Sequence, residues 1–350
     1  MRIRRPFPII IAVLIVAAGI ALLVVLRKHA PPEAARLLPG ADGFLYVNLQ
    51  WMRRANILEE LPSVPHDHDY EEFIQATGID FEKDLNEAAF SVHFPHAGDK
   101  PPQPRFSEIF VGKIHAQQLR SYLAKVASIE ENYRSLEIYS IPLEGRTVRV
   151  TILDPETVAA SNVDDPQVIR GIVERSRKLA SPFGGPALLR QYYKHVPLAS
   201  LGWAIVHVDP AADFFKTAPG PWLALLSQSA VLMASVRYIR ELHLRGVAFT
   251  GSEAEAENIS DRAQTYLTLF RAAEVSSGPL PQDPDVKALF DSLKVQQEGK
   301  RAIVTAIMPV GFIRKAVEEA PESVVPEPTP KQPAKSATTP PKRRKATPVH

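Results

Sequence analysis

The residues Gly43-Phe44-Leu45-Tyr46-Val47-Asn48-Leu49 and Gly202-Trp203-Ala204-Ile205-Val206-His207-Val208 form two similar apolar stretches in the two halves of the chain. Both are rich in β-branched and aromatic residues, which is typical of a strand. Each follows a short segment containing Leu and Pro, and each leads into a helical pattern. The similarity indicates that the order of elements restarts near residue 200. A duplication would produce such a restart, and so would chance in a mixed chain.

Around these two strands, alternating apolar residues predict further strands and apolar residues at helical spacing predict helices. The strands are expected at Ala88–Phe94, Ser107–Ile114, Leu136–Ile141, Thr147–Leu153, Thr157–Ser161, Ala230–Tyr238, Glu241–Thr250, Ser292–Glu298 and Arg301–Ile307. The helices are expected at Trp51–Glu60, His115–Ala127, Pro166 to about Lys178, Pro186–His195 and Ser252 to about Glu274. Turn residues separate neighbouring strands, which predicts antiparallel pairing.

The predicted fold class is α+β, with an N-terminal transmembrane helix followed by two antiparallel-sheet-plus-helix halves that are candidates for a duplication. A break at Ser181–Pro186 (SPFGGP) separates the halves. The expected organisation is an N-terminal membrane anchor at 1–30, a stiff Pro-rich linker at 31–40, a first half at 41–180, a second half at 181–320, and a disordered Pro-rich basic tail at 321–350.

The charge is distributed unevenly along the 350 residues. The overall net charge is +2, but residues 1–36 carry +5 and residues 321–350 carry +4, which leaves −7 for residues 37–320. A folded nucleic-acid-binding domain usually presents a basic face, so an acidic body argues against nucleic acid as a partner. A local basic patch within that body stays compatible with these numbers.

The N-terminal region contains an unbroken apolar run from Ile9 to Leu26, with 13 Ile, Leu or Val residues, four Ala and one Gly. About 20 apolar residues are needed to cross a bilayer as a helix. A cleaved signal peptide is the alternative, but its apolar region is shorter and it ends in a small-residue cleavage site, whereas Arg27 and Lys28 follow here. We therefore expect a single-pass signal anchor with a cytoplasmic N-terminus and an extracytoplasmic, periplasmic body.

The C-terminal tail has few large apolar residues and cannot offset the entropy of ordering, so disorder is expected. Near its end, the cluster Lys342-Arg343-Arg344-Lys345 is a candidate anion-binding segment for anionic lipid or an acidic polymer. A solvated tail that aids solubility is the alternative.

Histidines supply the candidate metal ligands. His66 and His68 occur in the run His66-Asp67-His68-Asp69, and His93 and His96 follow. Imidazole and carboxylate groups bind zinc, nickel and copper. The run resembles the H-x-H-x-D-H motif of the metallo-β-lactamase family, but Tyr70 and Glu71 stand where that motif requires Asp and His. A solvated surface loop is the alternative to a metal site.

Catalytic signatures are missing from the rest of the sequence. The chain has no phosphate-binding G-x-x-x-x-G-K-[ST], no G-x-G-x-x-G after a strand, no H-E-x-x-H and no G-x-S-x-G. It has no cysteine, which excludes a thiol nucleophile and disulfides. The sequence therefore favours a non-catalytic protein without a cofactor.

The layout resembles that of bacterial membrane-anchored families that have a duplicated α+β extracytoplasmic domain opening on a Leu-Pro-x-x-x-x-x-x-Tyr-Val strand. In this chain Leu38-Pro39 precedes Phe44-Leu45-Tyr46-Val47. The resemblance implies the anchored, two-part layout and no catalytic residues.

Three functions follow as hypotheses. The first is a membrane-anchored, extracytoplasmic, non-catalytic protein that binds a partner protein or assists envelope assembly. The second is an anchored metal-dependent hydrolase that uses the His66 and His68 region. The third is a cytoplasm-facing body whose basic tail binds acidic partners.

Overall fold

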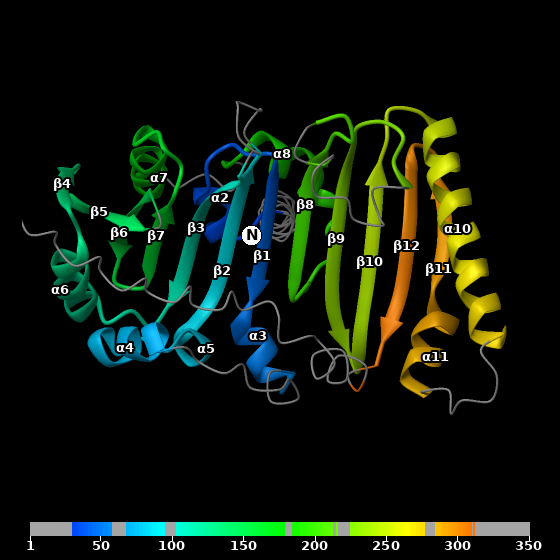
Figure 1. Ribbon diagram of the computed structural model, residues 1–350, viewed down its shortest axis with the longest axis horizontal. Helices are drawn as coiled ribbons and strands as arrows, with labels where there is room; N and C mark the ends of the chain where they lie inside the picture. The colour runs from blue at the N-terminus through cyan, green and yellow to red at the C-terminus, as the bar shows by residue number, and fades with distance from the viewer. Residues whose placement is uncertain are drawn as a thin grey trace, which may run out of the picture.

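A single antiparallel sheet of 12 strands organises the computed structural model (Figure 1). The structure describes residues 30–57, 68–94, 103–143, 145–178, 184–212, 215, 225–276, 284–309 and 311. The strands are β1 (Gly43–Asn48), β2 (Leu85–His93), β3 (Arg105–Gly112), β4 (Ile129–Tyr133), β5 (Leu136–Leu143), β6 (Arg146–Asp154), β7 (Thr157–Ser161), β8 (Gly202–Val208), β9 (Ala230–Ile239), β10 (Glu241–Phe249), β11 (Lys294–Glu298) and β12 (Arg301–Met308). The order across the sheet is β11-β12-β10-β9-β8-β1-β2-β3-β7-β6-β5-β4.

The two similar stretches of sequence lie side by side at the middle of this sheet. β1 and β8 pair antiparallel, with Gly43 opposite Val206 and Val47 opposite Gly202. From this pair, β1-β2-β3 run outward in the first half and β8-β9-β10 run outward in the second half. The last strand of the first half, β7, pairs with β3, and the last strand of the second half, β12, pairs with β10. The α+β class with a large antiparallel sheet is therefore confirmed, and the duplication of the two halves stays a prediction.

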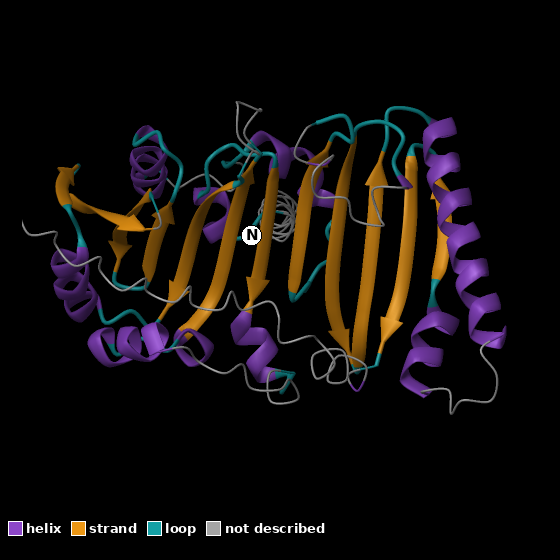
Figure 2. Cartoon of the chain, in the orientation of Figure 1, coloured by secondary structure: helices purple, strands orange, loops and turns teal. Residues whose placement is uncertain are grey.

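Ten described helices lie on the faces and at the ends of the sheet, and α10 is the longest of them, with 24 residues. They are α2 (Glu33–Leu37), α3 (Leu49–Arg54), α4 (His68–Thr77), α5 (Phe81–Asp84), α6 (Ala116–Val126), α7 (Gln167–Arg177), α8 (Ala187–Tyr192), the 3₁₀ helix η2 (Tyr193–His195), α10 (Glu253–Ser276) and α11 (Pro284–Ser292). In Figure 2 none of the described helices lies in front of β8, β9 or β10.

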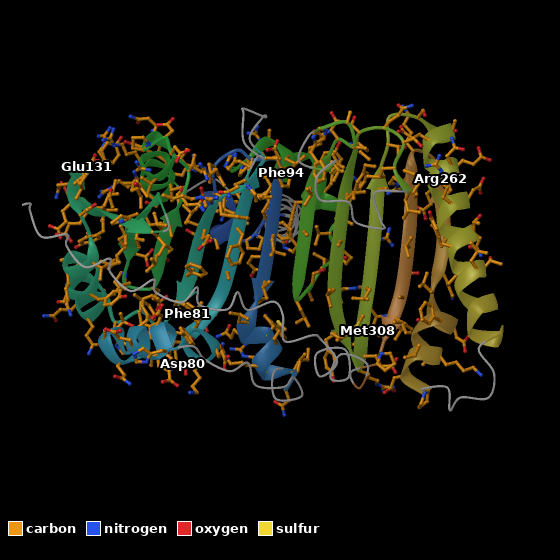
Figure 3. The ribbon with its side chains drawn as sticks, viewed as in Figure 1. Asp80, Phe81, Phe94, Glu131, Arg262 and Met308 are labelled. Atoms are coloured by element: carbon orange, nitrogen blue, oxygen red, sulfur yellow. The ribbon has the colours of Figure 1, made fainter. Side chains whose placement is uncertain are left out.

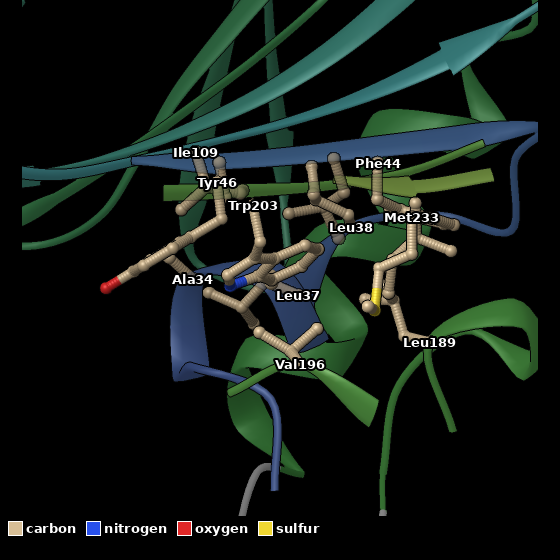
Figure 4. Close-up of a cluster of buried hydrophobic side chains, with 14 of the residues drawn as sticks. Ala34, Leu37, Leu38, Phe44, Tyr46, Ile109, Leu189, Val196, Trp203 and Met233 are labelled. Atoms are coloured by element: carbon tan, nitrogen blue, oxygen red, sulfur yellow. The ribbon is translucent and has the colours of Figure 1, made fainter. Parts of the chain in front are cut away.

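The two faces of the sheet differ because side chains alternate along each strand. We call the side that carries Phe44 the Phe44 face and the opposite side, which carries Leu45, the Leu45 face. On the Phe44 face, helices α2, α7 and α8 cover the main core (Figure 4). This core includes Leu37, Leu38, Phe44, Ile109, Ile169, Ile172, Leu189, Trp203, Ile205 and Met233.

The Leu45 face has separate clusters at its two ends instead of one continuous core. At one end α6 contributes Leu119 and Leu123 to a cluster with strand residues of the first half. At the other end Ile259 of α10 packs in a cluster with Ala248 and Ala302. Between these clusters Leu45 is 43% exposed although it lies on a central strand.

Several bounds differ by a few residues from the sequence expectation, and two elements differ in kind. The stretch 31–40, expected as a linker, contains α2, whose Ala34, Ala35 and Leu37 are buried. It belongs to the folded body because its apolar residues fill the space between the Phe44 face and α7. The strand β4 was not anticipated, because Ile129–Tyr133 is an edge strand with three exposed residues and no apolar alternation.

The predicted membrane segment Ile9–Leu26 and the tail at 321–350 lie outside the described residues. Among the helices that the structure does describe, none combines the length and apolarity needed to cross a bilayer.

Candidate functional site

A cavity of about 620 Å³ opens on the Leu45 face of the second half. Its floor consists of β8, β9, β10 and β12, one wall is α10, and residues at the ends of β2 and β3 close another side. The described lining residues are Val92, Phe94, Pro104, Phe106, Ala204, Val206, Val208, Phe215, Leu225, Leu226, Leu232, Met233, Ala234, Gly246, Val247, Ala248, Ile259, Ser260, Ala263, Val295, Ala302 and Val304. Cavities of 300–1,000 Å³ are the usual size for binding small molecules.

The floor is hollow because small residues meet across neighbouring strands. Ala204 of β8 lies opposite Ala234 of β9, which in turn lies opposite Gly246 of β10. A Cβ built on Gly246 would find only one heavy atom within 4 Å, the Val304 carbonyl oxygen at 4.0 Å. Ala234 is exposed although β9 is an interior strand. The register therefore produces a depression where larger residues would have produced a filled surface.

The wall of the cavity is a helix with a defined start. The backbone N–H of Glu255 donates to Ser252 Oγ at 3.3 Å, and Glu255 Oε2 accepts from the backbone N–H of Gly251 at 3.2 Å. The first bond is half of the capping box expected from Ser252 to Glu255, and the second reaches one residue further back, to Gly251 instead of Ser252; together they fix where α10 begins. The helix then packs against β11 and β12, which places Ile259 and Ala263 along the cavity.

Aromatic rings close the cavity at the side of the first half. The rings of Phe94 and Phe215 meet edge to face, with centroids 5.0 Å apart. The backbone N–H of Phe94 donates to Asp42 Oδ2 at 2.8 Å, which fixes the chain directly after β2. Figure 3 labels Phe94 at this end of the strand.

The chemistry of the cavity is almost entirely that of hydrocarbon. Ser260 is the only one of the described lining residues with a polar side chain. Its Oγ is buried and has no hydrogen-bond partner within the described parts of the chain. A lone hydroxyl in an apolar wall can bond to a polar atom of a bound molecule, since a buried group without a partner is unfavourable.

Glu108 adds a carboxyl group next to the cavity. It lies on β3 two positions after the lining residue Phe106, on the same face, and it is opposite Phe90 of β2. Burial raises the pKa of the Glu108 carboxyl. No hydrogen bond or ion pair joins this side chain to any other residue that the structure describes. An unpaired carboxyl beside an apolar cavity is a candidate contact for the polar end of an amphiphilic ligand.

The predicted metal ligands are only partly described. His66 and His96 lie outside the described residues. His68 is exposed at the start of α4, while His93 ends β2 and has a pKa that burial lowers, against an opposing effect of Asp42. The described residues contain no group of three or more His, Asp or Glu side chains that could hold a metal ion. The metal site stays a prediction, as does the anion-binding cluster Lys342 to Lys345, which is outside the described residues.

The sequence signal for the cavity was weak and easily missed. Ala204, Ala234 and Gly246 are small residues, but the same three strands also contain Gly202, Ala230 and Ala248. A small residue in a strand can indicate a close approach or a bend as well as a hollow. Only the register of β8, β9 and β10 shows that these three positions meet.

Comparison with known proteins gives no family. No family model matches the chain, and no curated protein matches it. Among solved structures, the chain is similar to crystal form I of TP0453, with 11% sequence identity and a TM-score of 0.38. The match covers 81% of this chain and 96% of that one.

Proposed function

We propose that this protein is a membrane-anchored, extracytoplasmic, non-catalytic binding protein that holds a hydrocarbon chain in the cavity on the Leu45 face. The observation that carries the proposal is the lining, in which Ser260 alone among the described residues has a polar side chain. The described lining contains no charged or hydrogen-bonding array for a sugar, nucleotide or peptide.

The expected ligand is a fatty acid or the acyl chain of a lipid. Each CH₂ group moved out of water contributes about 0.8 kcal/mol, so a ten-carbon chain contributes about 8 kcal/mol before the costs of association. An acyl ligand also has a polar end. Ser260 in the wall is the described lining group that can donate a hydrogen bond to it.

The membrane part of the proposal rests on Ile9–Leu26, which has the length and composition of a single transmembrane helix. A bilayer next to the body would be a source of acyl chains. A body outside the cytoplasm also agrees with the absence of cysteine.

Photolabelling tests the ligand directly. The full-length chain in lipid nanodiscs is exposed to palmitic acid that carries a diazirine, irradiated and digested, and the labelled peptides are identified by mass spectrometry. We expect labels on peptides from β9, β10 and α10. Labels confined to other peptides would contradict the proposal.

Two substitutions reduce the cavity without disturbing its charge. Ala234→Phe and Gly246→Val each place a larger side chain above the floor, where Ala234 is exposed and Gly246 has open space. We expect each to lower the labelling of the cavity peptides at least fivefold. The matched control is Ala254→Phe, because Ala254 is exposed on α10 and does not line the cavity. Equal labelling in all three variants would refute the cavity as the binding site.

A further inference from the structure

Basic side chains gather on the Phe44 face of the second half, on the other side of the sheet from the cavity. Arg237 of β9 lies opposite His243 of β10. Two positions further along β10, Arg245 lies opposite Thr305 of β12. Thr305 in turn lies opposite Lys294 of β11. Residues directly opposite each other in antiparallel strands share a face. Arg301 of β12 is on this face as well, four positions before Thr305. We call Arg237, His243, Arg245, Lys294 and Arg301 the basic strip.

The positive charges of the basic strip are poorly balanced. Arg301 forms an ion pair with Glu298 at 2.9 Å. For Arg237, Arg245 and Lys294 there is no ion pair or side-chain hydrogen bond to any described residue. The carboxylates of Glu241 and Glu298 are the acidic groups that the register places on this face of β10 and β11.

The helix η2, which packs against this face, adds positive charge instead of balancing it. It contributes Lys194 and His195, and the His195 ring lies 4.9 Å from the Phe249 ring. Burial lowers the pKa of His195, and the charges of Lys194, Arg301 and Arg245 lower it further. The field at this face is therefore positive, although residues 37–320 together carry −7. Cations held together without partners favour binding of an anion.

The first described helix packs on the same face of the sheet as the basic strip. The helix α2 packs on the Phe44 face and begins at Glu33. Leu26, the end of the apolar run, precedes Ala30 by four residues, which span at most about 14 Å when fully extended. A transmembrane helix at Ile9–Leu26 would therefore end close to the Phe44 face.

We infer that the basic strip binds the phosphate groups of anionic lipids and holds the Phe44 face of the body against the membrane. This inference rests on the membrane anchoring in the proposed function. Arg and Lys side chains near an anionic bilayer are attracted to its negative surface potential. Docking of this face leaves the cavity on the Leu45 face directed away from the bilayer.

The chain contains no cysteine, so a single introduced cysteine carries a fluorescent label at one known position. One reporter is Thr305→Cys, next to the basic strip, and the reference reporter is Leu45→Cys, because Leu45 is 43% exposed on the opposite face and does not line the cavity. Each labelled full-length protein is placed in nanodiscs of phosphatidylcholine, or of phosphatidylcholine and phosphatidylglycerol at three to one, with a nitroxide on a fraction of the headgroups as quencher. If Thr305→Cys does not fold, Gln296→Cys replaces it, because Gln296 is exposed and lies on the same face of β11.

We expect headgroup quenching at position 305 to be at least threefold stronger in the nanodiscs with phosphatidylglycerol than in phosphatidylcholine alone, and quenching at position 45 to stay weak in both. The triple variant Arg237→Gln, Arg245→Gln, Lys294→Gln abolishes the difference at position 305. The control Lys113→Gln, Lys125→Gln, Arg146→Gln removes the same net charge from the first half. In this control the difference in quenching between the two lipids should remain. Equal quenching in the two lipids, or a triple variant that behaves like the control, would overturn the inference.

The two proposals fail in different ways. Flotation of the full chain with liposomes in 1 M NaCl reports the anchor alone, because salt screens the attraction between exposed charges. If the full chain does not float, the proposed membrane anchoring is wrong. If the chain floats but its quenching does not depend on phosphatidylglycerol, only the inference about the basic strip is wrong. Photolabelling of the cavity in the triple variant is expected to equal that of the unmodified protein.

Discussion

Gly43 of β1 and Val206 of β8 lie directly opposite each other at the seam between the two halves of the sheet. A Cβ at Gly43 would come within 2.7 Å of Val92 Cγ1 and 3.1 Å of Val206 Cγ2. Both valines line the cavity. The missing side chain of Gly43 therefore allows the first half, the second half and the cavity wall to meet at one point.

Gly43→Ala tests this close approach. Valine side chains are stiff at χ1 and cannot swing away easily, so the added methyl group overpacks the seam. We expect the free energy of unfolding to fall by about 1–3 kcal/mol, as measured by urea denaturation followed by circular dichroism. The control is Gly246→Ala, whose new Cβ meets nothing closer than 4.0 Å and which should raise stability by up to about 1 kcal/mol. The same loss in both variants would show that the seam is not crowded.

Arg53 joins α3 to the start of β2. Its Nη1 donates to the carbonyl oxygens of Leu85 at 2.6 Å and Glu82 at 3.0 Å, and its Nη2 donates to Asn86 Oδ1 at 3.0 Å. We expect Arg53→Ala to lower the free energy of unfolding by about 1–3 kcal/mol, since charge-assisted bonds are lost and carbonyl groups lose their donors.

The neighbouring Arg54 provides the comparison for Arg53. Its guanidinium lies 5.7 Å from the ring centroid of the exposed Trp51, an interaction worth about 0.5–1 kcal/mol at exposed sites. Chemical denaturation of Arg54→Ala should therefore show the smaller loss. A larger loss for Arg54→Ala would contradict the role assigned to Arg53.

Much of this fold could be predicted from local pattern. Phe44 and Tyr46 alternate with the less buried Leu45 and Val47, which predicts a strand. Ser252 and Glu255 indicate the start of α10. Both signals can be detected because they depend on residues close together in sequence. The strand β4 lacks such a signal: Ile129, the only aliphatic side chain in it, is 64% exposed. Prolines before and after α2 indicated a linker, although the short segment between them is helical and buried.

The candidate site was much harder to predict than the fold. Its floor depends on Ala204, Ala234 and Gly246, which reach the same row only through the pairing of three strands. A shift of one residue in any pairing would move one of them to the other face. Register is a property of the whole sheet, so the sequence offered candidate site residues only in local patterns, the histidine run and the basic tail, while the preferred function was a non-catalytic binding protein.

Glu108 predicts an unusual pH dependence of stability. Burial raises the pKa of this carboxyl in the folded protein, so the folded state holds the proton more tightly than the unfolded state does. The carboxyl group therefore costs no stability below the unfolded pKa, near 4.3, and it destabilises the protein as the pH rises through the folded pKa.

We expect Glu108→Gln to be more stable than the unmodified protein at pH 8, with a difference that shrinks toward pH 4, in urea denaturation across this range. Glu257→Gln is the control, because Glu257 is exposed on α10. A Glu108→Gln variant that is less stable at pH 8 would show that the carboxylate has a stabilising partner.

A ligand in the cavity should raise the melting temperature of the folded body. Binding to the folded state alone stabilises it by about 2.7 kcal/mol when free ligand is at 100 times its Kd. For a domain of this size each kcal/mol shifts Tm by roughly 2–4 °C, so palmitic acid should raise Tm by roughly 5–10 °C in differential scanning calorimetry. Ala234→Phe should remove the shift because its ring occupies the space above the floor, whereas Ala254→Phe should retain it.

Octanoic acid should give a smaller shift at the same concentration, because each methylene that is absent removes about 0.8 kcal/mol of transfer free energy. A shift that does not depend on chain length would indicate that the carboxylate, and not the hydrocarbon, is the part that binds.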